Sequence, residues 1–360
     1  MTNHIPHRSY QKKYTLSSSR TGSTSLILGR GIVAFLFLFL LLQPQTALEA
    51  VRDGLLLWYH SVLPVLFPFM ILSGLIVRLH LIEQLPSWLF VPLQRLFRCS
   101  RNGCFAVLAG FLCGFPMGAR ITHDLHMQNM ISDQEAGHLY GFVNNVSPAF
   151  VISFLASECV HRPDTALFFL FCILGASFLY GILTRPKEIP ADTEDFSSSG
   201  EPAAFSFLLV DTCIWEGVRH TVKLGAYITL FSLITAAATC LLPPHGTASL
   251  IIPSCLEVTN GVLAVSSCEL PFFILAPLLC AVCAFGGLSA FAQTISIASM
   301  DSTLAFQYLK SRVTVTLLAA LLSCGVLLIA IHTSAGSKPA SVSSHYSSAV
   351  SLSDSEGIVE

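Results

Sequence analysis

Long apolar runs separated by short polar segments dominate this chain. Clear runs cover residues 26–45, 61–77, 165–184, 224–243 and 313–332. The hydrocarbon core of a bilayer is about 30 Å thick, and a helix of about 17–25 residues crosses it. The runs are continuous rather than alternating, which favours helices over the strands of a membrane barrel. The pattern therefore predicts an all-α polytopic membrane protein.

Two further apolar runs are short and interrupted by glycine. Residues 104–119 end in Gly-Phe-Pro-Met-Gly-Ala, and residues 271–285 run into Gly-Gly-Leu-Ser. Paired, Gly/Pro-interrupted segments in two halves of a chain are typical of the binding sites of secondary transporters. We therefore predict two related repeats, each with a re-entrant helical hairpin. Two unrelated glycine motifs that only pack helices together are the alternative.

Polar segments set the expected boundaries. We predict a disordered basic tail at 1–25, a first transmembrane span at 26–45, a first repeat at 46–184, a flexible acidic loop rich in Pro and Ser at 185–204, a second repeat at 205–332 and a disordered Ser-rich tail at 333–360. Every charged residue before Glu49 is Arg or Lys, so the positive-inside rule predicts a cytoplasmic N-terminus.

Composition narrows the class of protein. Of the 360 residues, 53% are hydrophobic and 11% are charged, whereas soluble domains average about 25% charged residues. This excludes a single soluble domain. The formal net charge of −2 provides no basic excess for nucleic-acid phosphates, so we expect no nucleic-acid partner.

The sequence lacks the common enzymatic and metal-binding motifs. The chain has no Walker loop, HExxH or GxSxG motif, so we expect no enzyme activity and no cofactor. Most of the 12 cysteines lie in or beside apolar runs, where a thiol behaves as a small hydrophobic group. The pair Cys280 and Cys283 has CxxC spacing but lacks a second pair, so we expect no metal site.

Four polar motifs adjoin the interrupted apolar segments and are the candidate substrate-binding residues. They are Gly114, Pro116, Gly118 and Arg120; Asn144, Asn145 and Ser147; Glu257, Thr259 and Asn260; and Gly286, Gly287, Ser289 and Gln293. An ionisable side chain at the centre of a membrane helix costs about 2.5–3.5 kcal/mol to insert. Such residues are therefore expected to face a cavity or a partner.

Each motif has a specific chemistry and a simpler alternative. The Arg120 guanidinium suits a carboxylate, although a pair with Asp124 one turn later would also explain it. The amides of Asn144 and Asn145 can bind a solute or bond neighbouring helices. Glu257 can bind a cation or a proton, or stand in an ordinary turn.

The last motif joins Ser289 to Gln293, which are four residues apart and share a helix face. These two polar groups can bind a solute together. Helix packing through the small residues of the motif is the alternative.

The motifs, in this order, resemble the YlbJ-type sporulation integral membrane proteins, within the wider nucleoside-recognition "gate" group. The matching segments are Gly-Phe-Pro-Met-Gly-Ala-Arg at 114–120, Asn-Asn-Val-Ser-Pro at 144–148, Leu-Glu-Val-Thr-Asn-Gly at 256–261 and Phe-Gly-Gly-Leu-Ser at 285–289. The resemblance covers about residues 30–332 and implies an architecture similar to concentrative nucleoside transporters.

The resemblance also implies a function and a location. It implies a transporter of a small organic anion, foremost dipicolinic acid moved into the developing spore, with a proton or sodium as possible coupling ion. The membrane would be the cell membrane or the outer forespore membrane of a spore-forming bacterium. A nucleoside-type solute transporter and a non-transporting sporulation scaffold are the alternatives. The sequence carries no signal for oligomeric state.

Overall fold

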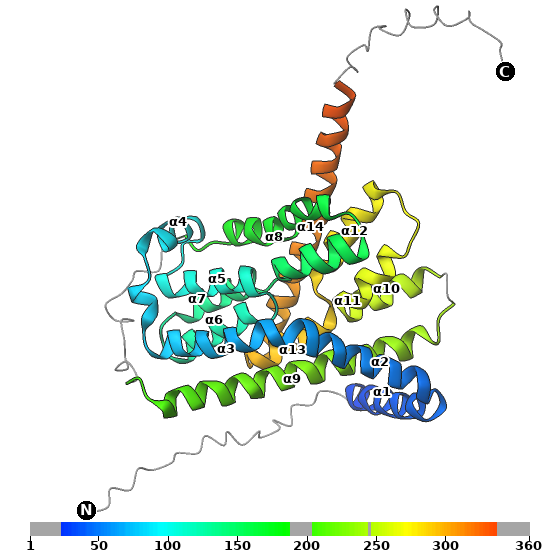
Figure 1. The fold of residues 1–360 in the computed structure, drawn as a ribbon, viewed down its shortest axis with the longest axis horizontal. Helices are drawn as coiled ribbons and strands as arrows, with labels where there is room; N and C mark the ends of the chain where they lie inside the picture. The colour runs from blue at the N-terminus through cyan, green and yellow to red at the C-terminus, as the bar shows by residue number, and fades with distance from the viewer. Residues whose placement is uncertain (1–22, 188–203, 244–245, 337–360) are drawn as a thin grey trace, which may run out of the picture.

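The computed structural model describes residues 23–187, 204–243 and 246–336, and every regular element in these ranges is helical (Figure 1). The expected tails at 1–25 and 333–360 and the expected loop at 185–204 fall mostly outside the described residues. Where they are described, Ser23 begins the first helix and the last helix continues to Gly336.

The helices follow one another with short connections. They are α1 (Ser23–Leu42), α2 (Pro44–Leu57), a π-helical turn (Trp58–Val62), α3 (Leu63–Arg78), a 3-10 turn (Leu81–Gln84), α4 (Ser87–Phe97), α5 (Arg101–Cys113), α6 (Met117–Met127), α7 (Asp133–Tyr140), the π-helical segment η3 (Phe150–Cys159), a 3-10 turn (Pro163–Thr165), α8 (Ala166–Leu183), α9 (Phe207–Thr239), α10 (Thr247–Leu256), α11 (Val258–Ser266), α12 (Phe272–Phe285), α13 (Gly287–Ile297) and α14 (Ser302–Gly336).

Four stretches of the described chain are long and apolar enough to cross a membrane. They are 163–183, 207–239, 272–297 and 302–333, with mean hydropathies from 1.5 to 2.5. The segments 29–42 and 44–60 qualify together as a fifth, bent by 109° at the break. The prediction of an all-α polytopic membrane protein is therefore confirmed.

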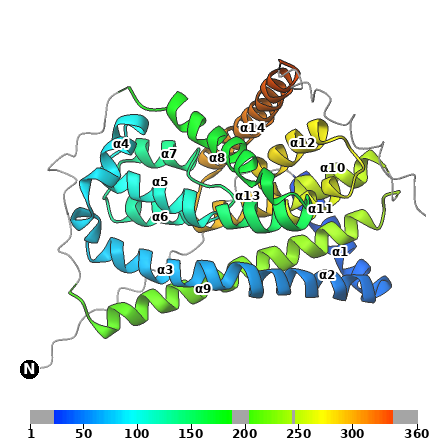
Figure 2. The same cartoon turned by 45° about the horizontal axis from the view of Figure 1, so that its top comes forward.

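Helix α9 lies side by side with α2 and α3 along most of its length (Figures 1 and 2). The Trp58 indole Nε1 donates a hydrogen bond to the Thr221 carbonyl, 2.9 Å away. The same indole lies directly over Gly225, where a Cβ atom would come within 2.7 Å of the ring. This contact fixes the long helix of the second half against the first half.

Two short helix pairs enter from opposite ends of the molecule (Figure 1). Helices α5 and α6 pack against each other on either side of a turn at Gly114, and α10 and α11 do so on either side of Glu257. Both pairs are too short to be full spans, and both turns point to the middle of the molecule. Each pair is a short helical hairpin, and a re-entrant position in the membrane stays a prediction.

The order of elements is similar in the two halves. A short helix pair, an interrupted helix and a long helix follow one another as α5–α6, α7–η3 and α8, and again as α10–α11, α12–α13 and α14. Gly114 and Glu257 lie between the helices of the two pairs, whereas Gly286 lies inside one apolar stretch, 272–297. The two related repeats, with limits at 46–184 and 205–332, stay predictions.

Candidate functional site

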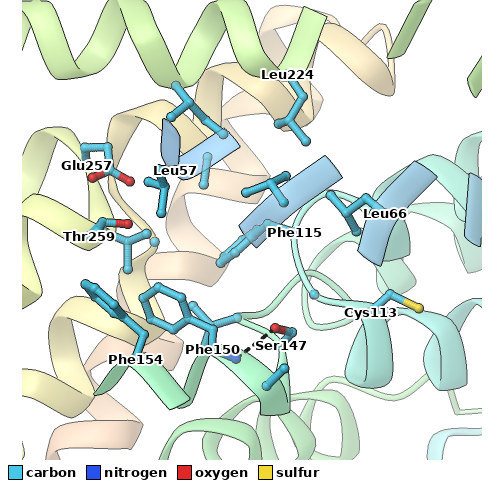
Figure 3. A pocket seen from close by; sticks show the side chains of 18 of the residues that line it. Leu57, Leu66, Cys113, Phe115, Ser147, Phe150, Phe154, Leu224, Glu257 and Thr259 are labelled. Carbon is cyan, nitrogen blue, oxygen red and sulfur yellow. Dashed lines mark hydrogen bonds between the residues drawn. The ribbon is translucent and has the colours of Figure 1, made fainter. Parts of the chain in front are cut away.

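A cavity of about 350 Å³ lies in the middle of the molecule, where the two hairpin turns meet the two interrupted helices. We call it the central cavity. Its walls come from α2, α3, the α5–α6 turn, the segment 146–158, α9, the α10–α11 turn and the Gly286 break with α13. Figure 3 shows Glu257 and Thr259 on one side of it, Phe150 and Phe154 below, and Phe115 reaching in from the other side.

The α5–α6 turn is held against the first interrupted helix at Gly114. This residue has a φ angle of +82°, which residues other than glycine rarely adopt. A Cβ atom at this position would lie 2.7 Å from the Ser147 backbone nitrogen. The next residue, Phe115, reaches the other half of the molecule. Its ring edge would lie 2.7 Å from a Cβ at Gly286. The first hairpin therefore touches both helix breaks.

The α10–α11 turn contacts the second break in the same way. A Cβ at Gly287 would lie 3.0 Å from the Glu257 Cα. Glu257 is 5% exposed, and its Oε2 accepts a hydrogen bond of 2.9 Å from the backbone N–H of Asn260. This bond caps the N-terminus of α11. Glu257 also lines the central cavity, next to Thr259.

The first interrupted helix is broken between α7 and η3. Helix α7 ends at Tyr140, an irregular segment follows, and η3 begins at Phe150. Pro148 explains the break. Proline lacks a backbone N–H donor, and it disfavours helical conformation at the residue before it.

The two asparagines of this segment are buried and bonded to the protein. Asn144 Nδ2 donates to Thr294 Oγ1 at 2.6 Å and to Tyr308 Oη at 3.0 Å. Asn145 Nδ2 donates to the Phe142 carbonyl at 2.9 Å, and Asn145 Oδ1 accepts a hydrogen bond from Ser177 Oγ on α8 at 2.5 Å. Neither asparagine lines the central cavity, so their interhelical bonding matches the alternative interpretation of this motif.

A buried arginine that the sequence interpretation missed supports the same segment. Arg312 on α14 is 1% exposed, donates to the Gly141 carbonyl at 2.7 Å, and donates also to the Asn144 carbonyl. Within the described residues no carboxylate pairs with it. The sequence did carry a signal for Arg312, because a charged residue beside a long apolar run is costly to insert and therefore indicates a specific role. The predicted span began at 313 and so left Arg312 out.

The polar groups of the central cavity are carboxylates and neutral donors. Its lining includes Glu158, Glu257, Ser147, Ser153, Thr259 and Gln293, and contains no Arg, Lys or His. The remaining walls are apolar, with Phe115, Phe150 and Phe154 as the large side chains. The site therefore suits a solute with a flat apolar surface and attracts positive charge.

Arg120 lies outside this cavity, contrary to its expected role as an anion ligand there. It is 2% exposed, with its Nε 3.2 Å from Asp124 Oδ2 and its Nη2 3.7 Å from Glu216 Oε2. Glu216 also pairs with Arg78 at 2.5 Å. These ion pairs connect α3, α6 and α9, and the pairing with Asp124 matches the simpler alternative. The side chain is held by carboxylates already present in the protein.

The structure brings about half of the candidate residues to one place. Gly114, Ser147, Glu257, Thr259, Gly286 and Gln293 line the central cavity. The other eight candidates do not line it: Pro116, Gly118, Arg120, Asn144, Asn145, Asn260, Gly287 and Ser289. Ser289 nevertheless supports it, because its Oγ accepts a hydrogen bond of 2.9 Å from Gln293 Nε2.

Most of the lining residues had not been singled out in the sequence. Among them are the three phenylalanines Phe115, Phe150 and Phe154 and one acidic residue, Glu158. Glu158 carried a signal, since it is an isolated acidic residue at the end of an apolar run. The phenylalanines carried none, because 26 phenylalanines are scattered through the chain.

Comparison with known proteins gives one informative relative. No protein-family model and no solved structure match the chain. Over 129 residues the chain is 34% identical to the sporulation integral membrane protein YlbJ of Bacillus subtilis (strain 168). The match covers 35% of this chain and 32% of the relative, so it spans about a third of each. It confirms, over that part of the chain, the similarity to YlbJ-type sporulation membrane proteins.

Proposed function

We propose that this multi-pass membrane protein is a transporter that carries a small solute through the central cavity. The observation that carries the proposal is the convergence of two opposed hairpin turns and two helix breaks on one cavity of about 350 Å³. Irregular backbone at membrane depth is tolerated where it lines a cavity. A site between opposed hairpins is reached from either side when one hairpin moves, as alternating access requires.

The first candidate solute is a small organic anion, with dipicolinic acid foremost. The relative's name places that protein in sporulation, and this supports the same setting here. The flat ring of dipicolinate would lie between Phe115 and Phe150. Its two carboxylates require positive charge, which the lining does not supply. We therefore propose that the anion enters with a cation, a proton or sodium, held by Glu257 and Glu158.

The second candidate solute is a nucleoside. The observation in its favour is the same lining of carboxylates and neutral donors. These groups can accept and donate hydrogen bonds to a neutral sugar and base without a counter-ion.

Basic residues support an orientation in the membrane. Arg98 donates to the Lys187 carbonyl, and Arg185 donates to the Leu96 carbonyl, so the C-terminal end of α8 and the end of α4 form a basic cluster. By the positive-inside rule this end of the molecule faces the cytoplasm. The membrane itself is proposed to be the cell membrane or the outer forespore membrane.

Uptake into liposomes that contain the purified full chain tests the proposal. Labelled dipicolinate and labelled uridine are offered separately, with an inward sodium gradient, an inward proton gradient or neither. We expect dipicolinate uptake above that of empty liposomes and stimulation by one of the gradients. Glu257→Gln removes the charge but keeps an oxygen for the α11 cap, so it should fold and lose gradient stimulation.

Glu269→Gln is the matched control, because Glu269 is an exposed glutamate that does not line the central cavity. It should transport as the unchanged protein does. If uridine but not dipicolinate is taken up, the nucleoside becomes the proposed solute instead of the organic anion. Uptake of neither solute above empty liposomes would contradict transport and favour the scaffold.

A further inference from the structure

Helix α4 lies on the surface of the molecule and has two different faces. With 11 residues it is too short to cross a bilayer. Phe90 and Phe97 are fully buried, whereas Trp88 is 75% exposed and Val91 and Arg95 are exposed too. Trp88, Val91 and Arg95 follow one another at intervals of three and four residues, so they share one face of the helix. The outward face of α4 therefore carries apolar surface and a positive charge together.

The C-terminal end of α4 is fixed to the C-terminal end of α8, at the edge of the molecule (Figure 1). The Phe97 ring packs edge-on against the Phe178 ring of α8, with ring centres 4.9 Å apart. Arg185, just after α8, donates a hydrogen bond of 3.2 Å to the Leu96 carbonyl. The apolar stretch 163–183 ends immediately before this contact, so the chain leaves the hydrocarbon core here. Helix α4 therefore lies at the level of the lipid headgroups.

Four basic side chains gather at this end of the two helices, and we call them the α4–α8 basic cluster. Arg98 follows α4 directly and donates a hydrogen bond to the Lys187 carbonyl. None of the ion pairs of the described chain involves any of the four, which are Arg95, Arg98, Arg185 and Lys187. The stretch 84–123 contains no Asp or Glu. The described chain therefore supplies no carboxylate partner for this positive charge.

The chemistry of this surface matches an anionic phospholipid. A guanidinium binds a phosphate through two parallel hydrogen bonds, and a lysine ammonium attracts it as a point charge. Tryptophan favours the boundary between headgroups and hydrocarbon, and short amphipathic helices with Trp and Arg lie in that plane. Each basic residue near an anionic membrane surface contributes about fivefold in affinity.

We propose that α4 and the α4–α8 basic cluster form a binding site for an anionic phospholipid. Arg95 and Lys187, both exposed, bind the headgroup phosphate, and Trp88 lies in the interface beside it. Arg98 and Arg185 join the two helices through backbone carbonyls and add to the positive field. This inference does not require that the protein transports a solute.

The sequence offers one other occupant for the basic cluster. Glu188, Asp192, Glu194 and Asp195 follow it in the chain and lie outside the described residues. An acidic segment would pair with the basic side chains but gives no reason for the exposed ring of Trp88. A phospholipid uses both the charge and the apolar surface, which is why we favour it.

Titration of the purified full chain with phosphatidylglycerol in a neutral detergent tests the site. The readout is the unfolding temperature, because a ligand that binds the folded protein raises it. We expect a saturable rise that phosphatidylcholine does not reproduce and that shrinks at high salt. Arg95→Gln combined with Lys187→Gln should raise the lipid concentration at the midpoint by about tenfold or more. Trp88→Ala should weaken binding less and keep the preference for phosphatidylglycerol.

Arg52→Gln is the matched control for Arg95→Gln alone. Arg52 is an exposed arginine on α2, with the acidic residues Glu49 and Asp53 close in sequence. Its replacement should leave the midpoint unchanged, whereas Arg95→Gln should shift it by about fivefold. Equal midpoints for the two variants would overturn the inference.

Two further outcomes would also overturn it. Soluble glycerol phosphate at the same phosphate concentration should not stabilise the protein, and an equal effect would make free phosphate the ligand. Replacement of the four acidic residues of 188–195 by their amides should change the midpoint little. Phosphatidylglycerol binding that appears only in that variant would assign the basic cluster to the protein's own acidic segment.

Discussion

The central cavity and a second cavity between α7, α8 and the beginning of α14 are close in size, about 350 and 320 Å³, and differ in the charge of their linings. The central one is lined by Glu158 and Glu257 and contains no Arg, Lys or His, whereas the second is lined by Lys310 and contains no Asp or Glu. The segment 141–147 lies between them, since Gly141 lines the second cavity and Ser147 the central one. The comparison teaches that one short irregular segment can separate two linings of opposite charge.

The largest expected effect concerns the wall between the cavities. Arg312→Met leaves the Gly141 and Asn144 carbonyls without their donors and should destabilise the protein by about 3 kcal/mol or more. Thermal unfolding in detergent measures the loss. Lys310→Met, two residues away and exposed, is the matched control and should unfold at nearly the original temperature. An unchanged transition for Arg312→Met would mean that the wall does not depend on this side chain.

The next effect concerns the contact of the first hairpin with the central cavity. Gly114→Ala forces a Cβ onto a residue at φ +82° and against the Ser147 nitrogen, and should cost about 2 kcal/mol or more. Gly175→Ala on α8 is the control, because nothing lies within 4 Å of its Cβ position. That change should be neutral or slightly stabilising. Equal unfolding temperatures for the two variants would contradict the tight contact at the turn.

A smaller effect distinguishes two roles for Arg120, a structural ion pair and a ligand for an anion. Arg120→Gln should lower stability by about 1–3 kcal/mol through the loss of its pairs with Asp124 and Glu216. It should leave the relative affinities for anions and neutral solutes unchanged. A double-mutant cycle with Glu216→Gln measures the coupling between α6 and α9. A change in anion selectivity without a change in stability would restore Arg120 as an anion ligand.

The smallest effect tests one edge of the central cavity. Ser147 Oγ accepts a hydrogen bond of 3.1 Å from the Phe150 N–H and so caps η3. Ser147→Ala should cost about 0.5–1 kcal/mol. Ser153→Ala, in the same lining, removes no hydrogen bond described for the chain and should change the unfolding temperature less. The reverse order would show that the cap does not hold this helix end.

Apolar run length and glycine position carried most of the correct fold prediction. The runs 165–184 and 313–332 appear as long helices, and Gly114 stands at a hairpin turn. The direction of the chain after each glycine break was not predictable in the same way. Gly286 and Gly114 look alike in sequence, yet one interrupts a span and the other reverses the chain. Local composition specifies a break, but packing against Glu257 and Phe115 sets the direction that the chain takes after it.

The site was predictable where residue type alone decides the role. Glu257 is a carboxylate beside a break in an apolar segment, and the structure places it on the cavity. Arg120 has the same kind of sequence context, but its partner Glu216 is 96 positions later on α9, so its ion pairing depends on the tertiary fold. Arg312 shows the converse, because its carbonyl partners belong to an irregular segment that no periodicity reveals.

The glycine contacts of the central cavity form a continuous row across the molecule. Gly114 meets Ser147, Phe115 meets Gly286, and Gly287 meets Glu257. Each contact joins a hairpin to an interrupted helix, and the second joins the two halves. In the transporter proposed above, these contacts would be separate closures in series. One of them could then open towards one side of the membrane while the others stay shut.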